Sequence, residues 1–428
     1  MRRVVILGGG YAGLHAHAVL KRQLNRQLAA GTCEIILVSR DPYHTFHGWT
    51  GEILSGQLPV ETTLTPIEPL VGNQFLQAEV LSLDASRNCL QLAVDGRVEE
   101  LTFDHLLLAT GSKDPFETLD GLAEHGWCIK DSRDMQKLVR RLEEIERSRA
   151  KVRNVVVVGG GFAGVETAAA LAERFAGNGQ TTIHLMSGTH ELLEQLRPQF
   201  DRLADTAAAA LRSSGVVVHA GQHAEAIECD HVRTADGYQL ASDLTIVAAG
   251  ISFSVLKGSE HLPRNGRGQL LTDCHLRVAG QHNIWAAGDL AEVLHPLTGA
   301  PCLANALWAM KQGDCVGRNI AAAVAGTRLK PFAFKGLGQT AGLPGGRGIT
   351  ELFGVQFTGR LAWLIRILFF AWYMPSRSRG FSLALELFSR MTRQSLSQKA
   401  HAWDSGSPAS DPVRSIGVSA PAHWHRPS

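Results

Sequence analysis

The chain of 428 residues lacks three features that would place it in other classes of protein. No window reaches the roughly 18 to 20 unbroken apolar residues of a membrane-spanning helix. The seven cysteines are scattered, odd in number and never spaced Cys-x-x-Cys, which argues against a disulfide scaffold or a zinc site. The formal net charge is only +2, so the composition indicates no nucleic-acid partner.

What the composition does contain is typical of a globular protein. Hydrophobic residues make up 45% of the chain and charged residues 19%, and the length is enough for two or three domains. An apolar strand begins within three residues of Met1, so we expect no secretory signal peptide. The cysteine pattern favours reduced thiols in a cytosolic setting, and we predict no metal site.

Two stretches of the chain are close copies of each other: VVILGGGYAGLHA at residues 4–16 and VVVVGGGFAGVET at residues 155–167. Each has an apolar run typical of a strand, then Gly-x-Gly-x-x-Gly, then the start of a helix, which is the context that gives this motif its meaning. The first glycine permits a tight turn, the second lets a pyrophosphate approach the backbone, and the third lets helix and strand pack closely. We assign cofactor binding to Gly8, Gly10, Tyr11, Ala12 and Gly13, and to Gly159, Gly161, Phe162, Ala163 and Gly164.

Two dinucleotide sites on one chain predict two dinucleotides. Hydride transfer needs a donor and an acceptor, so the economical pair is a bound FAD and a visiting NAD(P)H. A second apolar strand follows each motif, at 33–38 and 181–186, and an acidic residue that binds the adenosine ribose is expected at its end. The chain instead has Ser39, followed by Arg40, and Ser187. A serine hydroxyl still binds a ribose, and the missing carboxylate at Ser187 leaves both NADH and NADPH open as substrates.

Three further apolar strands, at 103–112, 242–252 and 283–293, end in turns of small residues. Such turns permit a close crossing over a bound nucleotide. A helix is predicted from about residue 303 to residue 325. We assign cofactor contacts in the three turns to Ala109, Thr110, Gly111, Gly250, Gly288 and Asp289.

The order of these signals resembles the flavoproteins of the pyridine-nucleotide oxidoreductase superfamily. The resemblance implies an α/β fold with two Rossmann-like dinucleotide-binding domains, the second inserted in the first. The FAD domain would comprise residues 1–113 and 251–330, and the NAD(P)H domain residues 114–250. By the same resemblance, Asp289 would bind the ribityl chain of the flavin, and the helix after it would direct its positive end at the flavin.

Within that superfamily the chain is similar to the type II NADH:quinone oxidoreductases. The segments RDPYHTFHGWTGEILSGQL at 40–58, GGGFAGVETAAALAE at 159–173, and much of 332–390 carry this similarity. It implies FAD-dependent NAD(P)H dehydrogenation with a membrane quinone as acceptor, and it places Glu166 near the nicotinamide and flavin. Glu166 is open to a second interpretation, as a carboxylate stabilised by the helix dipole.

The acceptor end departs from this pattern. Quinone-reducing members carry Ala-Gln-x-Ala-x-Gln, whereas here Leu307 and Lys311 replace both glutamines. Lys311, with Lys335 as a further candidate, would donate to a quinone carbonyl. A solvated helix residue is the alternative for Lys311. A sulfur or protein acceptor, with Cys128 and Cys315 as the candidate thiols, and a nucleotide sensor without turnover remain alternatives for the whole protein.

The C-terminal part, residues 331–398, is predicted to be a membrane-association module. The run LAWLIRILFFAWYM at 361–374 is too short to span a bilayer, and Trp363, Trp372 and Tyr373 suit a lipid interface. Seven basic residues and one acidic residue lie between Arg360 and Lys399. This favours peripheral contact through residues 357–395 at the cytoplasmic face of the inner membrane. A core helix or a homodimer contact is the alternative, and residues 399–428 are predicted to be a disordered tail.

Overall fold

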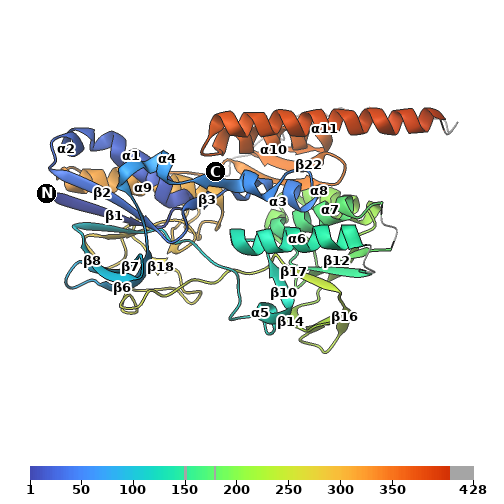
Figure 1. The fold of residues 1–428 in the computed structure, drawn as a ribbon, viewed down its shortest axis with the longest axis horizontal. Coiled ribbons are helices and arrows are strands. Elements are labelled where there is room, and N and C mark those ends of the chain that lie inside the picture. Colours follow the sequence, from blue (N-terminus) through green and yellow to red (C-terminus); the bar gives the residue numbers. More distant parts are fainter. Residues whose placement is uncertain (149–151, 178–179, 405–428) are drawn as a thin grey trace, which may run out of the picture.

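The computed structural model describes residues 1–148, 152–177 and 180–404. Two parallel five-stranded sheets lie in separate halves of the molecule, and the C-terminal helices lie mainly along one side of the second half (Figure 1). The first sheet has the strand order β19-β9-β1-β2-β5 and the second β10-β17-β11-β12-β13. The predicted α/β class is therefore confirmed.

The first sheet combines strands from two distant parts of the chain. Its strands are β1 (Arg2–Leu7), β2 (Cys33–Ser39), β5 (Phe75–Gln77), β9 (His105–Leu108) and β19 (Ile284–Ala286). Val4, Val5 and Ile6 of β1 are fully buried because helices cover both faces of a parallel sheet. The return of the chain at β19, after the whole second sheet, is the arrangement expected when one unit is inserted in another.

The second sheet has the same parallel arrangement, built from strands of its own. These are β10 (Gly126–Cys128), β11 (Asn154–Val158), β12 (Thr182–Ser187), β13 (Val217–Ala220) and β17 (Leu244–Val247). In both sheets a glycine turn leads from the central strand into a helix, α1 (Tyr11–Gln23) after β1 and α7 (Phe162–Arg174) after β11. The carboxyl ends of the parallel strands are the usual ligand side of such sheets.

Smaller elements surround the two sheets. Antiparallel strands β6 (Glu79–Asp84), β7 (Cys89–Val94) and β8 (Arg97–Thr102) belong to the first half, and β14 (Ala224–Ile227), β15 (His231–Thr234) and β16 (Gln239–Ala241) to the second. Helices α6 (Ser132–Ser148) and α8 (Asp201–Ser213) belong to the second half, and α3 (Thr50–Leu54), although it comes from the N-terminal part of the chain, packs against α7 in the core of the second half (Figure 1). Each half buries an apolar core of its own.

Helix α9 (Ala306–Val324) packs unusually close to α1 and corresponds to the helix predicted at 303–325. A Cβ built on Gly313 would lie 2.4 Å from the carbonyl oxygen of Ala12, and one on Gly317 would lie 2.8 Å from that of Ala16. Only glycine permits this approach at Gly313. It brings Gln312 to Gly288, whose N–H donates to Gln312 Oε1 at 2.7 Å. The turn that carries Asp289 is thereby fixed beside the first glycine motif.

The C-terminal module consists of strands β21 (Gly338–Leu343), β22 (Arg347–Leu352) and β23 (Val355–Thr358), followed by helices α10 (Gly359–Tyr373) and α11 (Arg377–Asp404). Trp363 is only 6% exposed, so the prediction that it lies at the surface is wrong: it faces the core side of α10. Among the described residues, no helix is long and apolar enough to cross a membrane.

The predicted boundary of the C-terminal tail also needs correction. Helix α11 continues to Asp404, so residues 399–404 are helical and not disordered. The first strong helix breakers after Lys399 are Gly406 and Pro408, which explains why the helix passes the predicted boundary. The rest of the predicted tail lies outside the described residues.

Candidate active site

The first glycine turn is shaped as a phosphate cradle. A Cβ on Gly8, whose φ is +113°, would lie 2.3 Å from the carbonyl oxygen of Ala109, and one on Gly13 would lie 1.9 Å from that of Gly8. A Cβ on Gly10 would meet nothing within 4 Å. Gly8 and Gly13 are thus required by the fold, whereas the bare backbone at Gly10 opens onto free space where a pyrophosphate fits.

The second turn has the same geometry. A Cβ on Gly159, whose φ is +132°, would lie 2.9 Å from the carbonyl oxygen of Ala248, and one on Gly164 would lie 1.7 Å from that of Gly159. At Gly161 the nearest atom to such a Cβ is Gln195 Nε2, at 3.6 Å. The middle glycine is again the open one, so both turns fit a dinucleotide.

Both cradles end in uncapped helix N-termini. Gly10 and Gly161 are the N-cap residues of α1 and α7, and neither helix has a side-chain hydrogen bond at its cap. The first-turn N–H groups of an α-helix have no partner within the helix and carry the positive end of its dipole. The N–H groups of the residues that follow each N-cap are therefore left to bind an anion such as a pyrophosphate.

The two serines at the ends of β2 and β12 differ in their surroundings. Ser39 is partly exposed beside Gly9, and the next residue, Arg40, pairs with Asp41 at 2.9 Å. Ser187 is 1% exposed, and its hydroxyl lies 2.9 Å from the Thr189 hydroxyl. The Ser187 hydroxyl is thus engaged within its own turn.

Asp289 lies in a polar cluster that joins the two halves of the molecule. Its Oδ2 accepts a hydrogen bond from Ser112 Oγ at 2.5 Å and lies 3.1 Å from Lys130 Nζ. Lys130 follows β10 of the second sheet, and its carbonyl is 2.9 Å from His47 Nε2. The N–H of His47 donates to the Tyr11 hydroxyl at 2.9 Å, and burial raises the pKa of Tyr11. Sequence reasoning missed Lys130 and Ser112, since no motif marks them.

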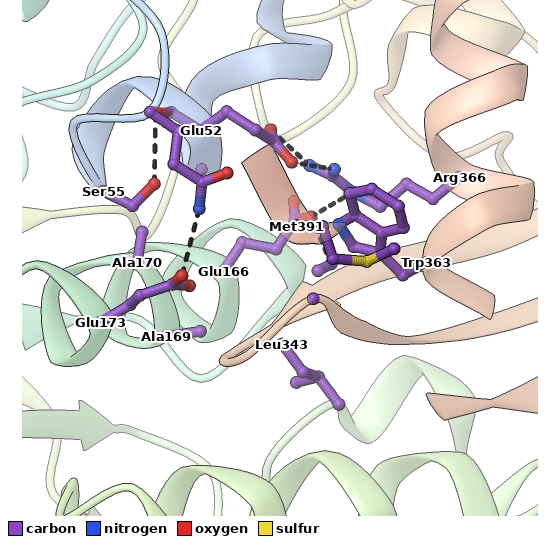
Figure 2. A pocket seen from close by; sticks show the side chains of 14 residues that line it. Glu52, Ser55, Glu166, Ala169, Ala170, Glu173, Leu343, Trp363, Arg366 and Met391 are labelled. Atoms are coloured by element: carbon purple, nitrogen blue, oxygen red, sulfur yellow. Dashed lines mark hydrogen bonds and ion pairs between the residues drawn. The ribbon is translucent and has the colours of Figure 1, made fainter. Parts of the chain in front are cut away.

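Glu166 lies in a buried group of charges from three parts of the fold (Figure 2). Its Oε1 accepts from Arg366 Nε at 2.9 Å and from the Gly342 N–H at 2.7 Å. Arg366, from α10, also donates through Nη1 to Glu52 Oε1 at 2.6 Å. Burial raises the pKa of Glu166, while Arg366 and the Gly342 N–H oppose that rise. The partners of Glu166 are thus specific groups in addition to the dipole of α7. Glu52 and Arg366 both lie in segments that carry the family similarity, but nothing in either segment predicts that they pair.

The residues at the predicted acceptor end lie on α9 and the loop after it. Lys311 Nζ lies 5.7 Å from the ring centre of Tyr373, 5.9 Å from that of Phe334 and 3.9 Å from Asp314 Oδ2. Leu307 is buried, and Lys335 is exposed. Lys311 is therefore a cation held among aromatic rings where α9 meets the end of α10, and Lys335 lies at the surface beyond Phe334.

The remaining turn residues assigned to cofactor contact lie at the carboxyl ends of their strands. Ala109 follows β9, and Thr110 and Gly111 continue from it toward the second half of the molecule. Gly250, with a φ of +76°, follows β17 and lies against Pro115. These positions place both small-residue turns at the ligand side of their sheets.

The cysteines do not form a redox pair. All seven are free thiols, and Cys128 and Cys315 are buried in different cores. Burial raises the pKa of Cys315 to about 11 and that of Cys128 further, so neither is a thiolate near neutral pH. In the described part of the chain, no group of three or more His, Cys, Asp or Glu residues has the arrangement of a metal site.

The fold and its two open cradles define a nucleotide-dependent oxidoreductase of the two-domain flavoprotein type. The chain belongs to the pyridine nucleotide-disulphide oxidoreductase family, whose model matches residues 2–313. Membership of this family implies FAD and NAD(P)H as the two dinucleotides, which the geometry of both cradles fits.

Several relatives match nearly the whole chain. Demethylphylloquinone reductase NdbB of Synechocystis is 30% identical over 395 residues, covering 91% of this chain and 96% of that protein. The type II NADH:quinone oxidoreductase of Staphylococcus epidermidis is 26% identical over 385 residues, covering 84% and 92%. NDH2 of Plasmodium falciparum, solved in complex with NADH, has a TM-score of 0.76 at 17% identity, covering 90% and 98%. The resemblance to type II NADH:quinone oxidoreductases is thus confirmed.

Proposed function

We propose that this protein is an FAD-dependent NAD(P)H:quinone oxidoreductase that works at a membrane surface. The observation that carries the proposal is the pair of glycine turns at the ligand side of two sheets, where a Cβ on the middle residue would meet nothing within 4 Å at Gly10 and only the side chain of Gln195, at 3.6 Å, at Gly161. The names of the whole-length relatives, a demethylphylloquinone reductase and a type II NADH:quinone oxidoreductase, support a quinone as acceptor.

Each cradle has its own role in this proposal. The N–H groups at the start of α1 hold the pyrophosphate of FAD, Ser39 binds its adenosine ribose, and Asp289 binds the ribityl chain. The N–H groups at the start of α7 hold the pyrophosphate of NAD(P)H. When bound, FAD would supply the redox chemistry of a two-electron carrier between NAD(P)H and a quinone. The protein supplies position and electrostatics.

Glu166 acts on the nicotinamide side. An ionised carboxylate beside the nicotinamide stabilises the positive charge that develops there as the hydride leaves. Glu166 is suited to this role because its Oε1 is fixed by Arg366 and Gly342, and its side chain remains 21% exposed.

Lys311 acts on the acceptor side. Its ammonium group lies among Phe334 and Tyr373, which form an apolar wall of the kind that suits a quinone ring. The cation stabilises negative charge that develops on a quinone oxygen. Lys335, at the exposed end of the same region, is a second cation near the entrance. Leu307 contributes only apolar surface, in place of the glutamine found in related enzymes.

The outer face of the C-terminal helices is the membrane-contact surface in this proposal. Three residues of α10 and three of α11 form two exposed apolar stripes: Leu361, Leu368, Trp372, Phe381, Leu385 and Phe388. The guanidinium of Arg377 lies 4.3 Å above the Trp372 ring. Apolar side chains beside basic residues favour the headgroup layer of an anionic membrane, here the cytoplasmic face of the inner membrane. A homodimer contact is the alternative use of this face.

The proposal is tested by two half-reactions of the purified full-length protein. Anaerobic stopped-flow mixing with NADH or NADPH is expected to bleach the flavin absorbance, and subsequent mixing with a short-chain quinone to restore it. A Lys311→Met variant tests the acceptor side: it should keep the first half-reaction, which serves as the internal control, and slow the second about tenfold or more. A flavin that NADH reduces but quinone leaves reduced would contradict the proposed acceptor.

A further inference from the structure

Arg366 is a charge buried in the middle of the strongly apolar helix α10. Its side chain is 1% exposed and points away from the apolar stripe formed by Leu361, Leu368 and Trp372. It donates to both oxygens of Glu52, at 2.6 and 3.3 Å, to the carbonyl of Gly48 at 3.1 Å, and to Glu166.

These contacts join three parts of the fold (Figure 2). Glu52 is in α3, from the N-terminal part of the chain, Glu166 is in α7, which follows the central strand of the second sheet, and Arg366 belongs to the C-terminal module. Two carboxylates therefore share one guanidinium. Breaking such a group on one side leaves a buried charge without a partner, which is strongly unfavourable.

The two oxygens of the Glu166 carboxylate have different hydrogen-bond partners. Arg366 Nε and the Gly342 N–H both donate to Oε1. No hydrogen bond to Oε2 is found among the described residues, so this second oxygen is the one available to a ligand. The charged groups around Glu166 are Arg366 from α10, Glu52 from α3 and, further along α7, Glu173, which lines the same cavity.

We propose that Arg366 is a positioning residue that fixes the place and the ionised state of Glu166, so that the C-terminal module completes the nicotinamide site. This inference rests on the role of Glu166 in the proposed function. A stability role alone would need no charge here, because apolar residues of similar volume often replace buried ion pairs without loss of stability.

Arg366 and Glu52 shift the pKa of Glu166 in opposite directions. Variants of the two residues should therefore move this pKa in opposite directions, which a purely structural role of Arg366 does not predict. Glu52→Gln removes a negative charge and should lower the pKa of Glu166. The double variant Arg366→Met/Glu52→Gln removes the cation without leaving Glu52 unpaired, and should raise the pKa of Glu166. Each shift is expected to be about one pH unit or more.

The direct readout is an infrared titration of the carboxyl band in the full-length protein, assigned to Glu166 by its loss in Glu166→Gln. The second readout is the pH profile of flavin reduction by NADH, whose acid limb should move in the same directions. Arg141→Met, which removes an exposed arginine from α6, is the matched control and should move neither. Flavin content and NADH dissociation constants identify variants that fold incorrectly.

The proposal is supported if the pKa of Glu166, read from the infrared band, falls in Glu52→Gln and rises in the double variant. A band that shifts in the same direction in both variants, or in neither, would overturn it, even if both variants lose activity. Failure of the proposed role of the nicotinamide site is distinguishable, since NADH would then not reduce the flavin of the unaltered protein.

Discussion

Lys130 Nζ lies 3.1 Å from Asp289 Oδ2, although Lys130 follows a strand of the second sheet and Asp289 a strand of the first. The two residues are 159 positions apart in the sequence. This pair places a cation and a carboxylate where the two dinucleotide-binding units meet. The position of Asp289 is therefore set by both halves of the molecule.

Replacing Asp289 by alanine tests its assignment to the ribityl chain. A hydrogen bond to a charged group contributes about 1.5 to 3 kcal/mol, so FAD binding should weaken by roughly one to two orders of magnitude. The dissociation constant is measured by fluorescence of added FAD on the flavin-free protein. Asp95→Asn, an exposed change in the turn between β7 and β8, is the control, and equal FAD affinity in both variants would refute the assignment.

Substitutions at the two middle glycines should each affect the binding of only one of the two dinucleotides. In Gly10→Ala the added methyl group meets no protein atom, so the fold should persist while FAD binding weakens about tenfold or more. In Gly161→Ala the flavin should be retained, while the KM for NADH rises by a similar factor. Flavin content and steady-state kinetics measure the two effects.

Gly266→Ala is the matched control, because a Cβ at Gly266 also meets nothing within 4 Å. It should change neither the flavin content nor the KM for NADH. Loss of flavin in the Gly161 variant, or an unchanged flavin content in the Gly10 variant, would show that the two cradles had been assigned to the wrong dinucleotides.

Asp114 gives the stability of the protein a specific pH dependence. Burial raises its pKa from 3.8 to about 6. A raised carboxyl pKa contributes stability that is present below pH 3.8 and is lost as the pH rises through about 6. The loss amounts to about 3 kcal/mol at most. Asp114→Asn should therefore match the unaltered protein near pH 4 and exceed its unfolding free energy above pH 6.

Denaturant unfolding at several pH values measures this difference. Glu117→Gln, a change at an exposed side chain in the same segment, is the control and should not reproduce the gain in unfolding free energy above pH 6. A difference for Asp114→Asn that is equally flat across pH would contradict the burial argument.

The apolar face of α10 and α11 should control binding to lipid. Leu385 is 71% exposed, and Leu385→Gln should reduce partition onto anionic vesicles about tenfold, as expected for the loss of one buried leucine side chain. Reduction of the flavin by NADH should be unchanged. Val98→Gln, at another exposed apolar residue, is the control, and binding that persists with a change in oligomeric state would favour the homodimer alternative.

The sequence was sufficient for the glycine cradles because their chemistry is local. At Gly8, Gly13, Gly159 and Gly164 the backbone itself excludes a side chain, and the same spacing recurs wherever a strand turns into a helix over a pyrophosphate. The order of strands and the return of the chain at β19 follow from the same repeated pattern.

The sequence was insufficient in two situations. In the first, the interaction partners are far apart in the chain; in the second, the exposure of a residue depends on which face of a helix packs against the core. Arg366 and Glu52 are 314 positions apart, and nothing in the segments around them predicts that they pair. Trp363 and Trp372 look alike in an apolar run, yet one is 6% and the other 51% exposed, because only packing selects the buried face of α10. Lys130 was missed for the first reason, and the surface position predicted for Trp363 was wrong for the second.

The most direct test of the whole account is the absorbance spectrum of the purified full-length protein, recorded anaerobically before and after one equivalent of NADH. The account predicts one bound flavin per chain and its bleaching by that single equivalent. A colourless protein that releases no flavin on boiling and takes none up on reconstitution would contradict it.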